Sequence, residues 1–268
     1  MIIIGEKLNG TIPKVKAAIE EKDEDFIRER AIQQAEAGAH YIDVCASTTP
    51  EVEVDTLKWM MNIVQNAVDT PLCIDSPNPK SIEAVIGEAE KPGIINSVSL
   101  EGNKCDVIFP LIGGTEWEVI ALTSDDEGIP MDVQKRVDIT RRLVEKAGEY
   151  NITPEKIHLD PLVMALPTDN ESLLKFIETM RTVKDEFPGL KVTSGLSNIS
   201  FGMPLRKTVN QSFLSIAMYE GMDSAIMDPC DQKILAVYYA TEALLGKDRY
   251  CRNFSKAYRK GLTSTKKR

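Results

Sequence analysis

Eight short runs of apolar residues alternate with longer segments of helical period along the whole 268-residue chain. Several of these runs are apolar almost throughout, as is typical of parallel strands whose outer faces are covered by helices. The strands expected on this pattern are Ile2–Ile4, His40–Val44, Leu72–Ile74, Ile94–Asn96, Glu118–Leu122, Ile157–Leu159, Lys191–Thr193 and Ser224–Ile226. The alternation therefore predicts an α/β chain built on a parallel sheet.

Each expected strand is followed by an amphipathic segment that predicts a helix. These segments are Asp25–Ala37, Val52–Val68, Pro79–Ala89, Lys104–Ile112, Asp132–Tyr150, Ser172–Glu186, Arg206–Tyr219 and Asp231–Leu245, with an added helical piece at Ile12–Glu21. Eight strand–helix units with short loops and no linker predict a (β/α)8 barrel, the TIM-barrel fold, as a single domain over residues 1–268. The basic end of the chain, from about Lys256, is expected to be a mobile tail.

The charge balance argues against a nucleic-acid partner. The chain carries 41 acidic and 32 basic residues, a formal net charge of −9, whereas nucleic-acid binding usually rests on a basic face. Without an apolar run of about 20 residues or a signal pattern at Met1, we expect a cytoplasmic protein with no membrane segment.

Five scattered cysteines without a CxxC spacing predict buried packing residues rather than a zinc site, unless Cys45 and Cys73 converge in space.

Polar residues follow nearly every expected strand. In strand order they are Glu6 and Asn9, Asp43, Asp75 and Ser76, Asn96 and Ser97, Ser124 and Asp125, Asp160, Ser197 and Asn198, and Asp228. Barrel enzymes assemble their sites from the C-terminal ends of strands, so we expect these side chains to meet at one mouth.

Two kinds of role compete for these strand-end residues. Asp, Ser and Asn are also favoured as helix caps, and this simpler role suits a set made up of Ser76, Ser124 and Asp125. It does not suit the other set, made up of Asp75, Asn96 and Asp160. Each of these three ends its strand before a Ser or a Pro, so its side chain should point into the barrel mouth.

This collection of carboxylates and amides favours an uncharged ligand that is rich in hydrogen-bond donors. Neither Gly195–Asn198 nor Asp228–Asp231 has the glycine-rich backbone of a barrel phosphate site. A pterin ring offers a 2-amino group and N3–H along one edge, which a carboxylate can accept together, and its O4 and N5 suit Asn or Ser donors. His40 and His158 lie in expected strands and are interpreted as structural.

Seven segments carry a resemblance to a known family. They are Ile3–Asn9, Leu72–Ser76, Ile95–Ser97, Leu159–Leu162, Gly195–Ser200, Asn210–Ala217 and Gly221–Ile226. In these segments, and most specifically in Gly195–Ser200 with the following Phe201–Arg206, the chain resembles the methyltetrahydrofolate:corrinoid methyltransferases. Their pterin-binding barrel is shared with dihydropteroate synthase and with the folate domain of cobalamin-dependent methionine synthase. The segments span nearly the whole chain in order.

The resemblance implies roles for the residues of the mouth. Asp75, Asn96 and Asp160 would hold the pterin ring by its polar edge, and Asn198 would reach N5, the atom that carries the methyl group. The wider folate site would add Glu6, Asn9, Asp43, Gly195, Ser197 and Arg206. The expected catalytic groups are Asn198, Asp75 and Asn96, and no protein-bound metal is expected.

The resemblance also implies a reaction. A methyl group would move by SN2 displacement between N5 of tetrahydrofolate and the cobalt of a corrinoid, with 5-methyltetrahydrofolate as the methylated partner. The corrinoid would be carried by a separate protein that docks over the mouth, and the enzyme would be a homodimer. Asn198 would stabilise charge at N5, and without a suitable histidine the proton would pass through water and Asp75 or Asn96.

The resemblance breaks at the end of the second strand. Many relatives carry Asn and then Gly shortly after the Asp of this strand, whereas Asp43 is followed here by Val44, Cys45 and Ala46. A thiol thus replaces an amide near the pocket. This departure leaves open the physiological partner and the direction of methyl transfer.

Three alternative functions stay open on the sequence. A dihydropteroate synthase would need a basic phosphate site, for which only Arg206 and Lys207 are near. A non-catalytic folate-binding subunit would bind the same ligand without changing a corrinoid. A metal-dependent lyase on the same barrel would need a cluster of His, Asp and Glu ligands, which the spacing does not indicate.

Overall fold

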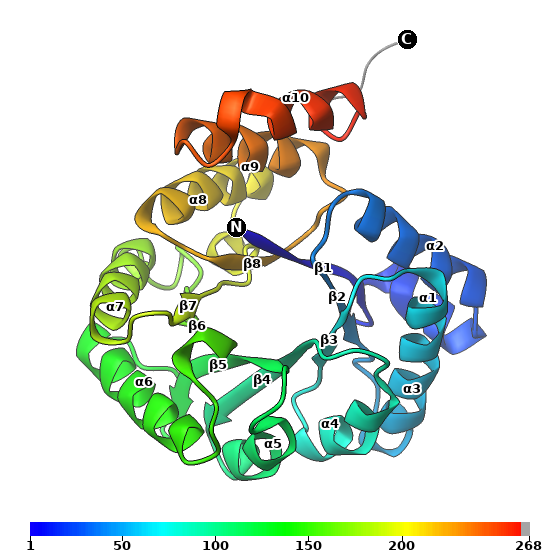
Figure 1. Cartoon of the computed structure of the whole chain (residues 1–268), viewed down its shortest axis with the longest axis horizontal. Coiled ribbons are helices and arrows are strands. Elements are labelled where there is room, and N and C mark those ends of the chain that lie inside the picture. Colours follow the sequence, from blue (N-terminus) through cyan, green and yellow to red (C-terminus); the bar gives the residue numbers. More distant parts are fainter. Residues whose placement is uncertain (264–268) are drawn as a thin grey trace.

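Eight parallel strands form a closed ring with helices packed around it, as Figure 1 shows for the computed structural model, which describes residues 1–263. The strands are β1 (Ile2–Asn9), β2 (Tyr41–Cys45), β3 (Leu72–Asp75), β4 (Ile94–Leu100), β5 (Glu118–Asp125), β6 (Ile157–Asp160), β7 (Lys191–Val192) and β8 (Ser224–Met227). Ladders join them in the order β7-β6-β5-β4-β3-β2-β1-β8. Between β7 and β8, Asp223 N donates to Val192 O at 2.9 Å and Ile226 N donates to Ser194 O at 3.0 Å, which closes the sheet. The predicted (β/α)8 barrel is confirmed.

The helices lie outside the barrel; α1 to α8 connect consecutive strands, and α9 and α10 follow β8. They are α1 (Pro13–Glu21), α2 (Glu24–Glu36), α3 (Pro50–Ala67), α4 (Pro79–Val85), α5 (Lys104–Ile112), α6 (Val133–Gly148), α7 (Ser172–Glu186), α8 (Arg206–Glu220), α9 (Gln232–Leu244) and α10 (Arg252–Arg259). Four 3₁₀ turns accompany them: η1 (Ile86–Glu88), η2 (Pro154–Lys156), η3 (Asn198–Ser200) and η4 (Arg249–Cys251). Several helices begin at a residue whose side chain accepts a first-turn N–H, namely Asp23, Asn78, Asp132 and Asp231.

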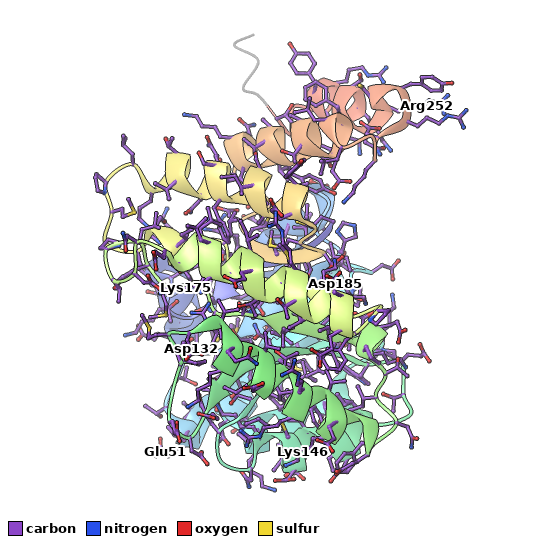
Figure 2. The ribbon with its side chains drawn as sticks, turned by 90° about the vertical axis from the view of Figure 1, so that its left-hand side faces the viewer. Glu51, Asp132, Lys146, Lys175, Asp185 and Arg252 are labelled. Carbon is purple, nitrogen blue, oxygen red and sulfur yellow. The ribbon has the colours of Figure 1, made fainter. Side chains whose placement is uncertain are left out.

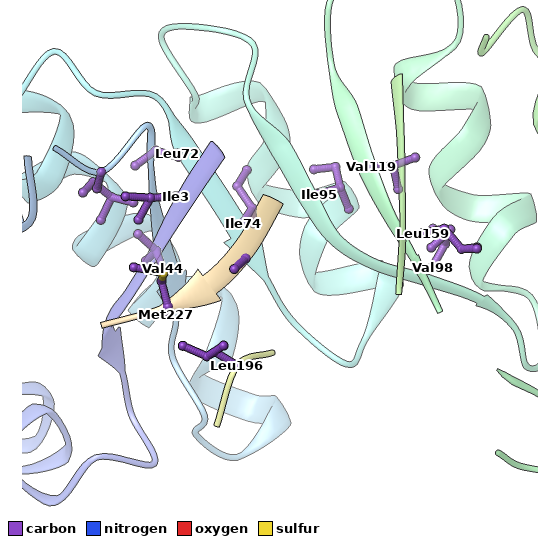
Figure 3. Close-up of a cluster of buried hydrophobic side chains, with 14 of the residues drawn as sticks. Ile3, Val44, Leu72, Ile74, Ile95, Val98, Val119, Leu159, Leu196 and Met227 are labelled. Atoms are coloured by element: carbon purple, nitrogen blue, oxygen red, sulfur yellow. The ribbon is translucent and has the colours of Figure 1, made fainter. Parts of the chain in front are cut away.

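The main hydrophobic core lies between the outer faces of the strands and the helices. Alternate strand residues such as Ile3, Val44 and Ile74 are fully or almost fully buried there, and Figure 3 shows several of these side chains between the two layers. The helices contribute Leu57 and Phe176 to the same cluster. This shell of apolar contacts fixes the strands and thereby the position of every side chain on their inner faces.

The inner faces of the strands form a second, smaller core inside the barrel. Its apolar middle layer consists of Ile4, Cys73, Ile94 and Ile120, all fully buried. Because side chains alternate along a strand, the residues two positions further on face the same interior, at the carboxyl end of the barrel. In three strands these next residues are Glu6, Asp75 and Asn96.

A polar layer closes the opposite end of the barrel interior. His158 is fully buried, and its two ring nitrogens bond to Ser224 Oγ (2.7 Å) and to the carboxylate of Glu118. Lys191 also bonds to Glu118. His158 lies two residues before Asp160, or about 7 Å along the strand. It is at the end of the barrel away from the mouth, where side chains serve stability rather than chemistry. The structural interpretation of His158 fits this placement.

The mouth and the base of the barrel lie on opposite sides of the molecule. Figure 2 shows Glu51, Asp132 and Lys175, near the starts of α3, α6 and α7, on one side, while Lys146 and Asp185, near the ends of α6 and α7, lie on the other. Helices that follow parallel strands start at the carboxyl ends of those strands. The side with the helix starts therefore carries the mouth.

Some sequence-based boundaries are corrected. Strands β1, β4 and β5 continue three to five residues beyond their predicted ends, to Asn9, Leu100 and Asp125. The predicted mobile tail from about Lys256 is wrong for its first part, because α10 runs to Arg259 and buries Ala257. The last residues of that tail, 264–268, lie outside the described residues.

Within residues 1–263, every helix is too short or too polar to cross a membrane.

Candidate active site

The carboxyl ends of the strands bring the predicted polar residues to one end of the barrel. In the ladders Asp75 lies opposite both Cys45 and Asn96, and Leu122 lies opposite Asp160. Neighbouring strands are about 4.8 Å apart. Side chains from adjacent strand ends therefore share one site.

Asp43 and Asn96 form a hydrogen-bonded pair in the mouth. Asn96 Nδ2 donates to Asp43 Oδ1 at 3.2 Å, and the thiol of Cys73 bonds to the same carboxyl group. Asp43 is only 1% exposed. Its burial, and then the charge of Asp75, raise the pKa of Asp43 well above the ordinary value for an Asp. The bond from Asn96 fixes the orientation of that amide.

Asp75 is bonded to Cys45, the residue at which the sequence was expected to depart from the family pattern. The Cys45 thiol bonds to the Asp75 carboxyl group, and Cys45 Sγ lies 3.1 Å from Ser47 Oγ. Burial raises the pKa of Asp75 to about 6. Burial and the neighbouring Asp75 also raise the pKa of the Cys45 thiol, which stays protonated. Cys45 therefore still supplies a hydrogen-bond donor at this position.

Asp160 is a buried acceptor at the end of β6. It is 5% exposed, Leu162 N donates to its Oδ1 at 2.8 Å, and Gly195 N also bonds to it. Burial raises the pKa of Asp160 to about 6, against the opposing effect of these N–H groups and of Arg136. At neutral pH most molecules therefore carry an ionised Asp160, which can accept a pair of N–H groups from a ligand.

Glu6 lies in a β-bulge of β1. The register with β2 shifts between Gly5 and Leu8, so the strand carries an extra residue there. Gln34 of α2, fully buried, accepts from Lys7 N at 2.9 Å and occupies the space that a side chain on Gly5 would need. Burial, and then the charge of Asp228, raise the pKa of Glu6 to about 7. Bulges next to sites re-aim side chains.

Asn198 is carried by a braced loop after β7. Asn198 begins η3 and is exposed. Its amide packs against the backbone of Gly195, where an added Cβ would lie only 2.8 Å from Asn198 Nδ2. Arg206 braces this loop, because its Nη2 donates to Ser197 O at 2.9 Å and its Nε donates to Ser200 Oγ at 3.1 Å. The amide of Asn198 is thus presented at the rim of the mouth on a fixed backbone.

Asn9 and Asp228 also reach the mouth, and both are engaged in local contacts. Asn9 Oδ1 accepts from Thr11 N at 2.9 Å and from the hydroxyl groups of Thr11 and Ser47. Asp228 accepts from Cys230 N at 2.8 Å and pairs with Lys7 Nζ at 3.3 Å. These bonds shape the loops around the site.

The capping role expected for Ser76, Ser124 and Asp125 is wrong. The caps of α4 and α6 are Asn78 and Asp132. Ser76 instead donates to the buried Glu53 at 2.8 Å, Ser124 bonds to Glu101, and Asp125 accepts from Glu127 N at 3.0 Å. The chain after each strand makes one more turn before its helix starts, so the cap falls two or more residues later.

Several residues that organise the site had no clear sequence signal. Gln34 and Arg136 are both fully buried on helices, and the only hint was a polar residue on an apolar helix face. Among residues 1–263, no group of His, Cys, Asp and Glu side chains is arranged to hold a metal ion.

Comparisons with known proteins show the family to which the chain belongs. Residues 5–228 match the family model described as pterin binding enzyme. The chain is 57% identical over 263 residues to a methylcorrinoid:tetrahydrofolate methyltransferase of Eubacterium limosum, with 97% of each chain covered. It is 28% identical over 240 residues to a methionine synthase of Mycobacterium tuberculosis, covering 85% of this chain and 20% of that protein.

Solved structures share the fold at low identity. A dihydropteroate synthase from Xanthomonas albilineans in complex with 7,8-dihydropteroate superposes with a TM-score of 0.64 at 19% identity, covering 90% of this chain and 93% of that one. A Yersinia pestis dihydropteroate synthase with a pterine-sulfa conjugate gives a TM-score of 0.69 at 16% identity, covering 92% and 93%. These likenesses concern the barrel alone.

Proposed function

Since the chain belongs to the family of pterin-binding enzymes, we propose that its mouth holds tetrahydrofolate while a methyl group passes between N5 and the cobalt of a corrinoid. The enzyme is a methyltransferase between a corrinoid and tetrahydrofolate, like the relative that matches it over nearly its full length. The observation that carries the site assignment is the convergence of Asp75, Asn96 and Asp160 at one barrel end.

The polar groups of the mouth fit a pterin ring. The buried Asp160 and the half-buried Asp75 are carboxyl groups that can accept the 2-amino group and N3–H, and Asn96 can face O4 or a ring nitrogen. Beside Asp160, the hydroxyl groups of Thr193 and Ser194 are buried and have no partner within the described part of the chain. Buried polar atoms are normally bonded, so a polar ligand edge would complete this site.

Asn198 is the group we assign to N5. Its amide lies at the rim, where a methyl group on N5 can still be reached from outside, and Arg206 keeps its loop in place. As N5 changes its bonding to the methyl group, its charge changes, and the oriented amide stabilises the charged form. Most of the rate gain comes from holding the two large substrates in line.

The rim of the mouth supports docking of a protein that carries the corrinoid. Two loops raise apolar side chains into solvent there, with Ile129 and Met131 about half exposed and Phe201 and Leu205 exposed by 70% and 80%. Exposed apolar clusters beside a site are typical of protein interfaces. We propose that the corrinoid protein covers these loops and that the methyl group moves from cobalt to N5, as in the name of the Eubacterium limosum relative.

The basic residues near the mouth do not favour the dihydropteroate synthase alternative. Arg206 is engaged with the Asn198 loop, and Lys207 pairs with Asp231 at 2.8 Å. A diphosphate would have to displace these contacts and face Asp228. The homodimer and the cytoplasmic location stay predictions.

Replacement of Asn198 tests the proposed function. We expect Asn198→Ala to keep tetrahydrofolate binding within a few fold and to lower methyl transfer by about 100-fold, the size found when one preorganised donor is removed. Binding would be measured by calorimetry and transfer by the absorbance of methylcobalamin. Unchanged turnover would remove Asn198 from this role. Asn253→Ala, on α10, is the matched control.

A further inference from the structure

Glu6 differs from the other carboxyl groups of the mouth in its contacts. The others each have a hydrogen-bond partner: Asp43 has Asn96, Asp75 has Cys45, Asp160 has Leu162 N, and Asp228 has Cys230 N. Within residues 1–263, the structure gives the Glu6 carboxyl group no hydrogen bond and no ion pair. Glu6 is nevertheless half-buried. A carboxyl group in this state is available to a ligand.

Contacts of the two neighbouring residues, Gly5 and Lys7, fix the position of Glu6. A side chain on Gly5 would come within 2.5 Å of Gln34 Oε1 and 3.3 Å of Pro229 Cγ, so the backbone of β1 packs tightly against its neighbours. Gln34 also fixes Lys7 N on the other side of Glu6. The bulge is thus pinned before and after Glu6, and its side chain stays at the inner edge of the strand end.

Charged groups face Glu6 from every neighbouring element. Asp228, after β8, disfavours the ionised form, whereas Lys7 of β1 and Arg206 of α8 favour it. Asp43 of β2 is also close to Glu6, because the charge of Glu6 raises the pKa of Asp43. The increase in pKa caused by burial is larger than the decrease caused by Lys7 and Arg206, and the pKa of Glu6 rises to about 7. Glu6 therefore changes protonation in the range where proton exchange is most effective.

Glu6 also lies toward the Asn198 side of the mouth. Arg206, whose charge reaches Glu6, bonds to Ser197 O in the loop that carries Asn198. Asp75 and Asp160 are committed to the donor edge of the ring in the proposed function. The buried His158 lies at the base of the barrel, bonded to Ser224 and Glu118. Asp228 also lies on the side assigned to N5, but it is bonded to Cys230 N and paired with Lys7, whereas Glu6 has no bonded partner among residues 1–263.

We propose that Glu6 exchanges the proton of N5 directly with tetrahydrofolate during methyl transfer. The lone pair of N5 attacks the methyl carbon, the Co–C bond breaks, and both its electrons stay on cobalt as Co(III) becomes Co(I). As the new N5–methyl bond forms, N5 gains positive charge, and the Glu6 carboxylate takes its hydrogen as a proton in the same step. Glu6 then passes this proton to water. The proposal rests on the proposed function, and it replaces the water relay through Asp75 or Asn96.

The test compares wild-type enzyme with Glu6→Gln, which keeps the shape of the side chain but cannot take a proton. Single-turnover transfer from methylcobalamin to tetrahydrofolate would be followed between pH 5.5 and 9. We expect the wild-type rate to rise with pH through about 7, as Glu6 ionises. In Glu6→Gln this rise should disappear and the rate at pH 8 should fall about 100-fold. Tetrahydrofolate affinity should stay within about threefold.

Three results separate the possibilities. A Glu6→Gln rate within threefold of wild type, with the pH dependence retained, overturns the proposal. Loss of tetrahydrofolate binding by Glu6→Gln also overturns it, because Glu6 would then be a ring ligand. Glu6→Asp, which keeps the carboxyl group, should restore part of the pH dependence. The control is Glu20→Gln, which changes an exposed side chain on α1. If wild type itself transfers no methyl group, the proposed function fails instead.

Discussion

At the scale of single residues, burial gives ordinary side chains the properties that the site needs. Asp75 and Asp160 reach a pKa of about 6 and Glu6 one of about 7, in each case mainly because burial disfavours the charged form. Asp43 and Cys45 are shifted in the same direction. A set of like-charged groups in one mouth thus stays partly protonated near neutral pH, and a pterin edge can meet both acceptors and donors.

Asp160→Asn tests the acceptor role of the ring-binding set. We expect tetrahydrofolate affinity to fall about 10- to 100-fold, since hydrogen bonds to charged groups contribute about 1.5–3 kcal/mol. In wild type the affinity should fall as pH drops through about 6, because protonation of Asp160 removes an acceptor. Titration calorimetry from pH 5 to 8 measures both effects.

A matched exchange outside the site controls that experiment. Asp126→Asn changes the same chemical group in a loop, where Asp126 Oδ1 accepts from Gly102 N, and it should leave the affinity and its pH dependence unchanged. Thermal unfolding of Asp160→Asn should occur no lower than in wild type, because the neutral amide removes a buried charge. Equal affinity of Asp160→Asn and wild type at pH 8 would contradict the role of Asp160.

At the scale of elements, the loop after β7 is the part that presents a reacting group. Three contacts determine its shape: Gly195 leaves room for the Asn198 amide, and Arg206 bonds to Ser197 O and Ser200 Oγ. Phe201 also packs near the Arg206 guanidinium, with 5.9 Å from Cζ to the ring centroid. The loop is exposed on one side, but its backbone is held at several points.

Gly195→Ala tests whether this shape matters. The added methyl group would lie 2.8 Å from Asn198 Nδ2, so the exposed amide has to turn away while the backbone can remain. We expect methyl transfer to fall about tenfold, which corresponds to about 1.4 kcal/mol, with the unfolding temperature nearly unchanged. The control is Gly148→Ala in α6, where nothing lies within 4 Å of the new group and where stability should rise slightly. Wild-type turnover by Gly195→Ala would show that the amide position is not critical.

Much of the element order was predictable, because strands and helices differ in the period of their apolar residues. The strand ends were not. The apolar pattern stops at Ile4 in β1, while the backbone ladder continues to Asn9 through polar residues that serve the site. Helix α10 was missed because it spans only eight residues, mostly polar and basic, and buries only Ala257. The positions of Asp75, Asn96 and Asp160 were predictable, since strand order alone brings them together.

The contacts of the site were less predictable than its members. The bonds from Cys45 to Asp75 and from Gln34 to Lys7 N depend on register and on a bulge, which no local pattern encodes. The isolation of Glu6 follows from the same bulge. These details arise from packing between distant segments, so they became visible only in three dimensions.

At the scale of the whole molecule, the two ends of the barrel have separate tasks. The base is closed by the buried network of His158, Glu118 and Ser224, which stabilises the strands. The mouth gathers the carboxyl groups and raises exposed apolar side chains such as Phe201 and Leu205 around them. A polar site inside an apolar rim suits a small ligand at the strand ends and a protein partner over the loops.

The central claim is that this barrel moves a methyl group between cobalt and N5 of tetrahydrofolate. The most direct measurement is NMR of a reaction under reducing, oxygen-free conditions that contains the enzyme, tetrahydrofolate and methylcobalamin labelled with ¹³C in its methyl group. The account predicts that the ¹³C signal moves to the N5-methyl position of tetrahydrofolate, mole for mole with the loss of methylcobalamin. Tetrahydrofolate that binds while the label stays on cobalt would contradict it.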